Sequence, residues 1–220
     1  QKTGQIVAIG REAKKMDGKT PAHISIVRPL VEGVVSDFEV TEEMLAYFIR
    51  KVEKMNKKFF RPRVVIGVPS GITNVEMRAV YDAAINAGAR EVFLVEEAMA
   101  AAIGVRLPVL SSTASLIVDI GGGTTDVALI SLGGIVRSLN LRVAGDHFNA
   151  RVIEYLRDEF KLLIGEQTAE QVKISIGSAV ETDYAELEVR GRDMITGLPR
   201  ALVVSDGDIS RCIIYDHGQG

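Results

Sequence analysis

The sequence has 220 residues, 47% of them hydrophobic and 25% charged, which is the composition of a globular protein with one or two cores. Lys and Arg number 26 against 29 Asp and Glu, so the formal net charge of -3 gives no electrostatic footprint for nucleic acid. The only cysteine, Cys212, excludes an internal disulfide and a cysteine-based zinc cluster, and fits a reducing compartment such as the cytoplasm.

The sequence also lacks targeting and membrane signals. No stretch approaches the roughly 18 consecutive apolar residues that a membrane-spanning helix needs. The chain opens with QKTG, without an initiator Met and without the basic and apolar regions of a signal peptide. We therefore expect the sequence to start inside a longer protein.

The first elements in chain order are short. Apolar runs at residues 5–9 and 24–27 predict two strands around a lysine-rich stretch. Apolar residues at three- and four-residue steps over residues 42–60 predict an amphipathic helix. Residues 63–69 form a nearly continuous β-branched run, which predicts a strand that is buried on both faces.

A helix, a strand and a second helix follow. Thr73 and Glu76 make a capping box, and this helix should end before Gly88. A strand over residues 91–95 leads into an alanine-rich helix over residues 97–105. This βαβα order predicts a mostly parallel sheet with covering helices.

The second half changes character at residues 107–115, a segment with Pro and Ser where we place a domain boundary. Strands at residues 115–120, 127–131 and 135–143, joined by short glycine-containing turns, predict an antiparallel meander.

Two helices and two strands should complete the chain. We expect the helices over residues 146–164 and 169–176, the second starting at a Thr168/Gln171 capping box. The strands are expected at residues 185–190 and 200–204.

The segment DIGGGTTD, residues 119–126, carries the clearest chemistry. Consecutive glycines let backbone N–H groups approach an anion, and the two threonines add hydroxyl donors. The predicted phosphate contacts are Asp119, Gly121, Gly122, Gly123, Thr124 and Thr125. Asp119 ends the incoming strand, where a carboxylate can hold Mg²⁺ largely through its retained waters, and Asp126 is a second possibility.

The context of the glycines separates this loop from other nucleotide motifs. A strand rather than a helix follows them, so neither a Rossmann nor a P-loop motif is present. The flanking Asp and Thr residues favour a phosphate site over a glycine-rich hairpin without a ligand.

Two further charged pairs are weaker signals. Glu96 and Glu97 lie where a strand gives way to a helix, so either could orient a water as a general base or interact with the helix dipole. Glu170 and Lys173 share one helix face and could bind ribose and adenine or form a solvated ion pair. Local spacing alone favours the helix-dipole interaction for Glu96 and Glu97, and the solvated ion pair for Glu170 and Lys173.

Together these segments resemble the actin-like ATPase superfamily and, within it, the MreB family of bacterial actins. The resemblance runs from residue 5 to about residue 211 and includes FRPRVVIGVPSGITNVEMRAVYDAA, AGAREVFLVEEAMAAAIG, IVDIGGGTTDVALISLGGIV and IGEQTAEQVKISIGSA. It implies that DIGGGTTD is the second phosphate loop for ATP and that Asp119 contacts the hydration shell of Mg²⁺.

The resemblance also assigns the charged pairs. In the family a glutamate of the EEPMAAA pattern orients the attacking water on the γ-phosphate, which implies a catalytic role for Glu97 with Glu96 beside it. Ala98 replaces the proline of that pattern, which loosens the turn. TAEQVK resembles the adenosine-pocket helix, which implies that Glu170 and Lys173 bind the nucleotide.

The implied fold class is α/β, an actin-like two-lobed ATPase fold with ribonuclease H-like cores and the nucleotide in the cleft. Neither a DLGT-type first phosphate loop nor a GGGS-type adenine loop occurs, so we expect this fold to be incomplete at both termini. The implied divisions are a small subdomain and core of the first lobe (1–36 and 37–107), a core and small subdomain of the second lobe (108–143 and 144–205), and the start of a return to that core (206–220).

The function implied by the resemblance is cytoskeletal. The resemblance implies that the monomers polymerise head to tail with ATP, and a heterologous contact that does not close gives an open filament. The expected partners are further copies of the chain, the cell-wall elongation machinery and the inner membrane surface, with the filaments on the cytoplasmic side directing wall synthesis and rod shape. The alternatives are a heat-shock chaperone ATPase, a sugar or acid kinase, or a nucleotide-binding structural protein without hydrolysis.

Overall fold

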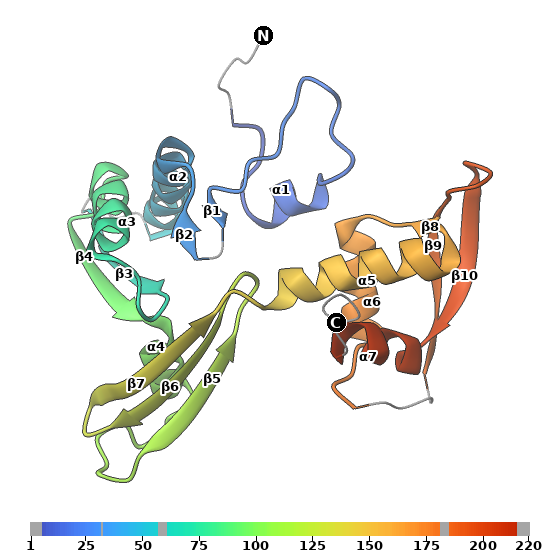
Figure 1. The fold of residues 1–220 in the computed structure, drawn as a ribbon. Helices are drawn as coiled ribbons and strands as arrows, with labels where there is room; N and C mark the ends of the chain where they lie inside the picture. The colour runs from blue at the N-terminus through green and yellow to red at the C-terminus, as the bar shows by residue number, and fades with distance from the viewer. Residues whose placement is uncertain (1–5, 32, 57–60, 181–184, 215–220) are drawn as a thin grey trace. The chain divides into compact units, whose positions relative to one another are not determined.

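The computed structural model describes residues 6–31, 33–56, 61–180 and 185–214 (Figure 1). Its helices are α1 (Arg11–Lys15), α2 (Phe38–Asn56), α3 (Asn74–Asn86), α4 (Glu97–Gly104), α5 (Gly145–Phe160), α6 (Glu166–Ile176) and α7 (Asp206–Ile214). Its strands are β1 (Leu30–Val31), β2 (Val34–Val35), β3 (Arg63–Val68), β4 (Glu91–Glu96), β5 (Ser115–Ile120), β6 (Thr125–Ser131), β7 (Gly134–Leu141), β8 (Leu162–Leu163), β9 (Glu186–Asp193) and β10 (Pro199–Ser205).

The chain divides into two compact units. The central unit is Ser25–Ala144, and the terminal unit joins Gln1–Ile24 to Gly145–Gly220. The expected domain boundary at residues 107–115 lies within the central unit, where the Ser111 carbonyl accepts a hydrogen bond from the Leu132 N–H at 2.9 Å. The finer subdomain boundaries expected from the sequence stay predictions.

The central unit contains a parallel pair and an antiparallel meander. β3 and β4 pair in parallel, which confirms the parallel pairing predicted from the βαβα order. β5, β6 and β7 form the predicted antiparallel meander in that order. α2 and α3 lie side by side in Figure 1. α4 packs its buried small residues, Ala98 and Ala102, against Ala128 and Ile130 of β6. The helix that starts at Glu97 is thereby held against the strand that follows the glycine loop.

β3 is a strand as predicted, but the expectation of burial on both faces is wrong. Its end residue Val68 is buried, whereas Val65 is 67% exposed, and the Val65 register partner Phe93 is exposed as well. Among the described residues β4 is the strand that pairs with β3, and the face that carries Val65 stays open.

Local signals placed α3 well. The Thr73 hydroxyl accepts a hydrogen bond from the Glu76 N–H at 3.2 Å, and the Glu76 carboxylate accepts one from the Thr73 N–H at 2.7 Å. Gly88 follows the helix at a φ of 111°, a conformation that glycine adopts at little cost. The predicted capping box and the predicted stop are both confirmed.

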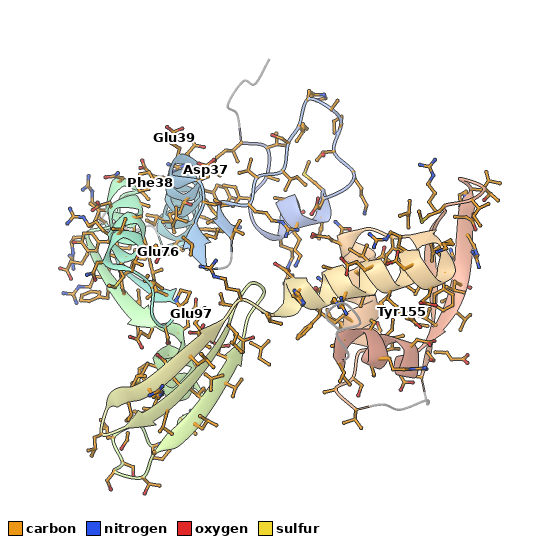
Figure 2. The ribbon with its side chains drawn as sticks, viewed as in Figure 1. Asp37, Phe38, Glu39, Glu76, Glu97 and Tyr155 are labelled. Atoms are coloured by element: carbon orange, nitrogen blue, oxygen red, sulfur yellow. The ribbon has the colours of Figure 1, made fainter. Side chains whose placement is uncertain are left out.

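α2 is confirmed as a helix but begins earlier than predicted, at Phe38. The Asp37 Oδ1 atom accepts a hydrogen bond from the Val40 N–H at 3.0 Å and so caps its first turn (Figure 2). This start precedes the stretch of apolar periodicity from which the prediction was made. The predicted end at residues 57–60 lies outside the described residues.

The terminal unit packs α5, α6 and α7 with an antiparallel sheet of order β10-β9-β8. The two longer strands confirm the predictions at residues 185–190 and 200–204. Its core is a cluster of fully or nearly fully buried apolar residues: Val152, Leu156, Leu162, Ala169, Val172, Ile176, Val189, Val204, Ile209 and Cys212.

Two helix predictions in the terminal unit need correction. α5 ends at Phe160 and not at residue 164, because Lys161 adopts a left-handed φ of 54° and the chain then enters β8. α6 begins at Glu166, with Gly165 as its N-cap residue and no side-chain cap. The predicted Thr168/Gln171 capping box is therefore wrong, because Thr168 already lies inside the first turn.

The two strands expected near the N-terminus are also wrong over the described residues. Residues 6–9 and 24–27 are not in strands, and α1 lies between them. A strand requires hydrogen bonds to a neighbouring strand, and no described segment pairs with either run.

Candidate functional site

Glu97 lies where β4 meets α4 in the central unit (Figure 2). Its side chain is half-buried, whereas Glu96 is exposed and, as the N-cap residue, makes no side-chain capping bond. Burial raises the pKa of Glu97, and the negative charges of Asp126 and Asp119 raise this pKa further. A carboxylate with a raised pKa is a better proton acceptor near neutral pH than an ordinary one.

Asp119 and Asp126 are register partners on β5 and β6, so their side chains lie on the same face of the meander. Asp126 is only 2% exposed, and both of its oxygens accept hydrogen bonds. Oδ1 accepts from the Ser70 N–H at 2.9 Å, and Oδ2 accepts from the Asn140 side-chain amide at 3.0 Å. Asp126 therefore fastens the turn after β3 and the strand β7 to β6.

The glycine loop turns tightly between β5 and β6. The Gly121 N–H donates to the Thr124 carbonyl at 2.9 Å, and a Cβ at Gly121 would lie 3.3 Å from that oxygen. Thr124 is buried, and the Thr125 hydroxyl donates to the Val143 carbonyl at 2.6 Å. This hydrogen bond ties the start of β6, directly after the glycine loop, to the segment after β7, a contact that the sequence did not indicate.

The β1–β2 hairpin packs against the same loop. Its turn residue Gly33 has a φ of 76°, and a Cβ there would lie 2.5 Å from Pro69 Cγ and 3.5 Å from Thr124 Cγ2. A side chain at this position would collide with the turn after β3. The hairpin, that turn and the glycine loop therefore pack together as one assembly within the central unit.

The donor set fits a hydrated magnesium ion better than a fully protein-bound metal. Over the part of the chain that the structure describes, no three His, Cys, Asp or Glu side chains group as direct metal ligands. Mg²⁺ commonly keeps several waters and uses only one or two carboxylates. Asp119, next to the negative potential at Glu97 and Asp126, matches that pattern.

Glu170 and Lys173 form a partly buried pair on α6 of the terminal unit, with side chains 28% and 19% exposed. The Lys173 Nζ atom donates to Glu170 Oε2 at 2.9 Å and to the Gly145 carbonyl at 3.0 Å. The Asn149 side-chain amide donates to the same Glu170 oxygen at 2.6 Å. These contacts make the pair a fixed group rather than the solvated pair that its spacing alone favours.

These hydrogen bonds make the stability of the terminal unit sensitive to acid. The hydrogen bonds from Lys173 and then Asn149 lower the pKa of Glu170 below its ordinary value of 4.5. A lowered pKa in the folded state contributes stability that is present above pH 4.5 and is lost as the pH falls through the folded pKa. In Lys173→Met we expect the pKa of Glu170 to rise, so that this loss begins at a higher pH. An NMR titration of the Glu170 carboxyl carbon measures the shift, and an unchanged pKa in the variant would contradict this account.

The structure brings Glu97, Asp119 and the glycine loop together within the central unit, and places Glu170 and Lys173 in the terminal unit. Sequence reasoning did not identify the residues that hold these groups in place: Gly67, Ser70, Asn140 and Asn149. Asn149 left a readable signal, since it stands at the buried positions of α5 together with Val152 and Leu156. A buried amide at an apolar position needs a hydrogen-bond partner.

A family model described as MreB/Mbl protein matches residues 1–216. The chain belongs to the MreB/Mbl family. Among curated MreB/Mbl relatives, it is 49% identical over 211 residues to the cell shape-determining protein MreB of Pasteurella multocida and 50% identical over 205 residues to that of Escherichia coli. The alignments cover 94% and 93% of this chain but 60% and 59% of those proteins. This MreB/Mbl chain thus spans about 60% of the length of the curated relatives it matches.

Solved structures agree with this membership and confirm the predicted actin-like α/β fold. MreB5 of Spiroplasma citri bound to ADP matches with a TM-score of 0.90 and 38% identity, over 97% of this chain and 64% of that one. The same protein bound to AMPPNP matches with a TM-score of 0.88. The MamK double helical filament, at 24% identity and a TM-score of 0.74 over 94% of this chain and 60% of that one, shares the fold.

No helix in the described part of the MreB/Mbl chain is long and apolar enough to span a bilayer.

Proposed function

We propose that this chain supplies much of the nucleotide site of a cytoskeletal ATPase that assembles into filaments and determines rod cell shape. The supporting observation is the grouping of Glu97, Asp119 and Asp126 beside a tight glycine loop in a member of the MreB/Mbl family. Relatives in that family are named cell shape-determining proteins, and solved MreB5 structures contain ADP or AMPPNP. The proposal extends that binding to this chain, with ATP as the nucleotide.

The glycine loop would bind the phosphates. Gly121, Gly122 and Gly123 present no side chains, so phosphate oxygens can approach the loop closely, and the backbone N–H groups of Gly122 and Gly123 would bind them. The Gly121 N–H is bonded to the Thr124 carbonyl and holds the turn, and Thr124 and Thr125 complete the loop. Asp119 would hold Mg²⁺ through water molecules, and the ion would offset the phosphate charge beside three carboxylates. Fixed donors and a nearby cation are what phosphoryl transfer requires, because its catalysis is mostly positioning and electrostatic stabilisation.

Glu97 would orient the water that attacks the γ-phosphate, with Glu96 beside it. Its half-buried position and its raised pKa suit a carboxylate that accepts a proton from water. Because Ala98 is buried against β6, the start of α4 is anchored even without a proline in that position. We expect slow, Mg²⁺-dependent hydrolysis of ATP.

Glu170 and Lys173 would bind the adenosine. Both hydrogen bonds to Glu170 are accepted by Oε2, so Oε1 can accept hydrogen bonds from the ribose hydroxyls. The lowered pKa keeps Glu170 ionised, which strengthens those bonds. The Lys173 ammonium has three protons, two of which are used, and the third can be donated to the nucleotide.

The wider role proposed here concerns the protein at the length of its relatives. Monomers would polymerise head to tail in an ATP-dependent manner, at the inner face of the cell membrane and together with the cell-wall elongation machinery. Sedimentation with ATP and with ADP tests assembly. Phosphorylation of a small molecule without sedimenting polymer would favour a kinase instead.

The test of nucleotide binding is calorimetry with ATP and Mg²⁺ on the 220-residue chain and on a form lengthened at both ends to the span of the relatives. Binding by both forms would show that the residues named above suffice for recognition. Binding by the longer form alone would show that recognition needs further segments. Binding by neither form would contradict the proposal.

The Lys173→Ala substitution should raise the dissociation constant for ATP by about tenfold to a hundredfold in the form that binds. The reason is the loss of a charged hydrogen-bond donor, whose removal usually costs about 1.5–3 kcal/mol. Lys15→Ala is the matched control, because Lys15 forms an exposed pair with Glu12 at the same three-residue spacing. Equal affinities for Lys173→Ala and the unchanged chain would return Lys173 to a purely structural role.

A further inference from the structure

Gly67 leaves a gap in β3 that the side chain of Glu97 occupies. A Cβ at Gly67 would lie 3.0 Å from Glu97 Cγ, 3.8 Å from Cδ and 3.5 Å from Oε1. Three bonded atoms of the Glu97 side chain therefore pass over the point where any other side chain at position 67 would begin. This is close packing of one side chain on a backbone.

The backbone of β3 does not itself require a glycine at this position. Gly67 is outside the set of glycines with positive φ, and it pairs in regular parallel register with Val95. A glycine inside a strand weakens the strand, and it commonly marks a place where another group approaches the backbone closely. Val65 lies two residues earlier on the same face of β3 and carries a valine side chain, so the gap over the strand is limited to position 67.

The position of the gap connects it to the other carboxylates. β3 ends one residue after Gly67, and the Ser70 N–H in the turn that follows is held by Asp126. Asp126 and Asp119 in turn lie close enough to Glu97 for their charges to act on it. The Glu97 carboxylate is thus confined between the backbone of β3 and the acidic end of the meander.

We propose that Gly67 is a positioning residue, whose missing side chain lets the Glu97 carboxylate fold back over β3 to the place where it orients the attacking water. This inference rests on the proposed function of Glu97. A methyl group at position 67 would push against Cγ, and the flexible Glu97 side chain would swing toward solvent. The fold would tolerate that movement. The attacking water would lose its alignment, and small misplacements of reacting groups lower the rate of reaction strongly.

The first test is the Gly67→Ala substitution, measured in the form that hydrolyses ATP. The turnover number should fall by at least about tenfold while the dissociation constant for ATP stays within about twofold. Gly104→Ala is the matched control, because a Cβ at Gly104 would meet nothing within 4 Å. Unchanged turnover in Gly67→Ala, or a fall matched by Gly104→Ala, would overturn the inference.

A second test does not depend on hydrolysis. In Gly67→Ala the Glu97 carboxylate should move out of its half-buried site, so its pKa should fall toward the ordinary value. An NMR titration of the Glu97 carboxyl carbon in the 220-residue chain measures this pKa, again with Gly104→Ala as control. A pKa that stays as high as in the unchanged chain would show that Gly67 does not place the carboxylate.

A double-mutant cycle with Glu97→Asp identifies the contact. Aspartate is one methylene shorter and does not extend over position 67, so adding Gly67→Ala to Glu97→Asp should change the residual turnover by less than about twofold. If Gly67→Ala lowers the turnover of Glu97→Asp as much as it lowers that of the unchanged chain, Gly67→Ala acts through something other than the Glu97 side chain.

Glu97→Gln distinguishes the role of Gly67 from the role of Glu97. If Glu97→Gln keeps full turnover, the proposed role of Glu97 fails. If Glu97→Gln loses turnover and Gly67→Ala does not, only the role of Gly67 fails.

Discussion

The Glu97→Gln substitution should lower the rate of ATP hydrolysis by about a hundredfold to ten-thousandfold, the range typical of a lost general base. Glutamine has nearly the same shape as glutamate, so it should fill the space over Gly67, but it cannot accept a proton from water. The dissociation constant for ATP should change little, and nucleotide-dependent assembly should persist. Phosphate release under single-turnover conditions, with sedimentation in parallel, measures both properties.

The control for this prediction is Glu91→Gln. Glu91 is the first residue of β4, at the opposite end of the strand from Glu97, and pairs with Arg63 at 2.8 Å on a largely exposed surface. Its substitution should leave hydrolysis unchanged. If Glu96→Gln rather than Glu97→Gln removes turnover, the water-orienting role belongs to Glu96, and unchanged turnover in both variants would remove the assignment altogether.

The Asp126→Ala substitution should destabilise the central unit by on the order of 3 kcal/mol, because hydrogen bonds to a charged group contribute about 1.5–3 kcal/mol each. It removes the acceptor of the Ser70 N–H and of the Asn140 amide, and the Ser70 residue is buried. A buried donor without a partner is costly. Urea unfolding, read from the midpoint and the slope, measures the change.

Two comparisons sharpen this second prediction. Asp126→Asn keeps an oxygen that accepts the Ser70 N–H, but its side-chain NH₂ group faces the NH₂ group of Asn140 and cannot accept from it. This variant should lose part of the stability of the central unit. Adding Asn140→Asp supplies an acceptor and should recover some of that loss. Asp82→Ala removes an exposed pair with Arg78 and should have no measurable effect. If Asp126→Ala unfolds at the same urea concentration as Asp82→Ala, Asp126 does not fasten the turn after β3 and the strand β7 to β6.

Features that depend on a few neighbouring residues could be predicted from the sequence. The Thr73 capping box, the stop at Gly88 and the meander around the glycine loop follow from local backbone preferences, and the structure has all three. The proximity of Glu97 to Asp119 followed only from the family resemblance, because 22 positions separate them and neither periodicity nor capping relates them. Their assigned roles stay predictions.

Features that depend on distant contacts could not be predicted. A strand needs a partner, and the apolar runs near residues 6–9 and 24–27 have none among the described residues. The glycine at position 67 looked like part of a buried strand, since nothing in the local sequence shows that the Glu97 side chain crosses it. The partners of Asp126 and Glu170 likewise come from other elements, and of these partners only Asn149, at a buried position of α5, left a signal in the sequence.

The hydrogen bond between Ser70 and Asp126 has a consequence for the order of folding. It joins positions 56 residues apart, and contacts of long sequence separation form late, because the entropy of closing a long loop opposes them. Helices such as α3 and the β5–β6 turn can form early from local contacts, before the strand β6 after the glycine loop and the turn after β3 are joined. A chain that has just collapsed would thus have its helices but not yet the grouping of Glu97, Asp119 and Asp126. With the nucleotide site proposed above, nucleotide affinity would then distinguish native molecules from partly folded ones, and bound nucleotide would in turn stabilise the native state.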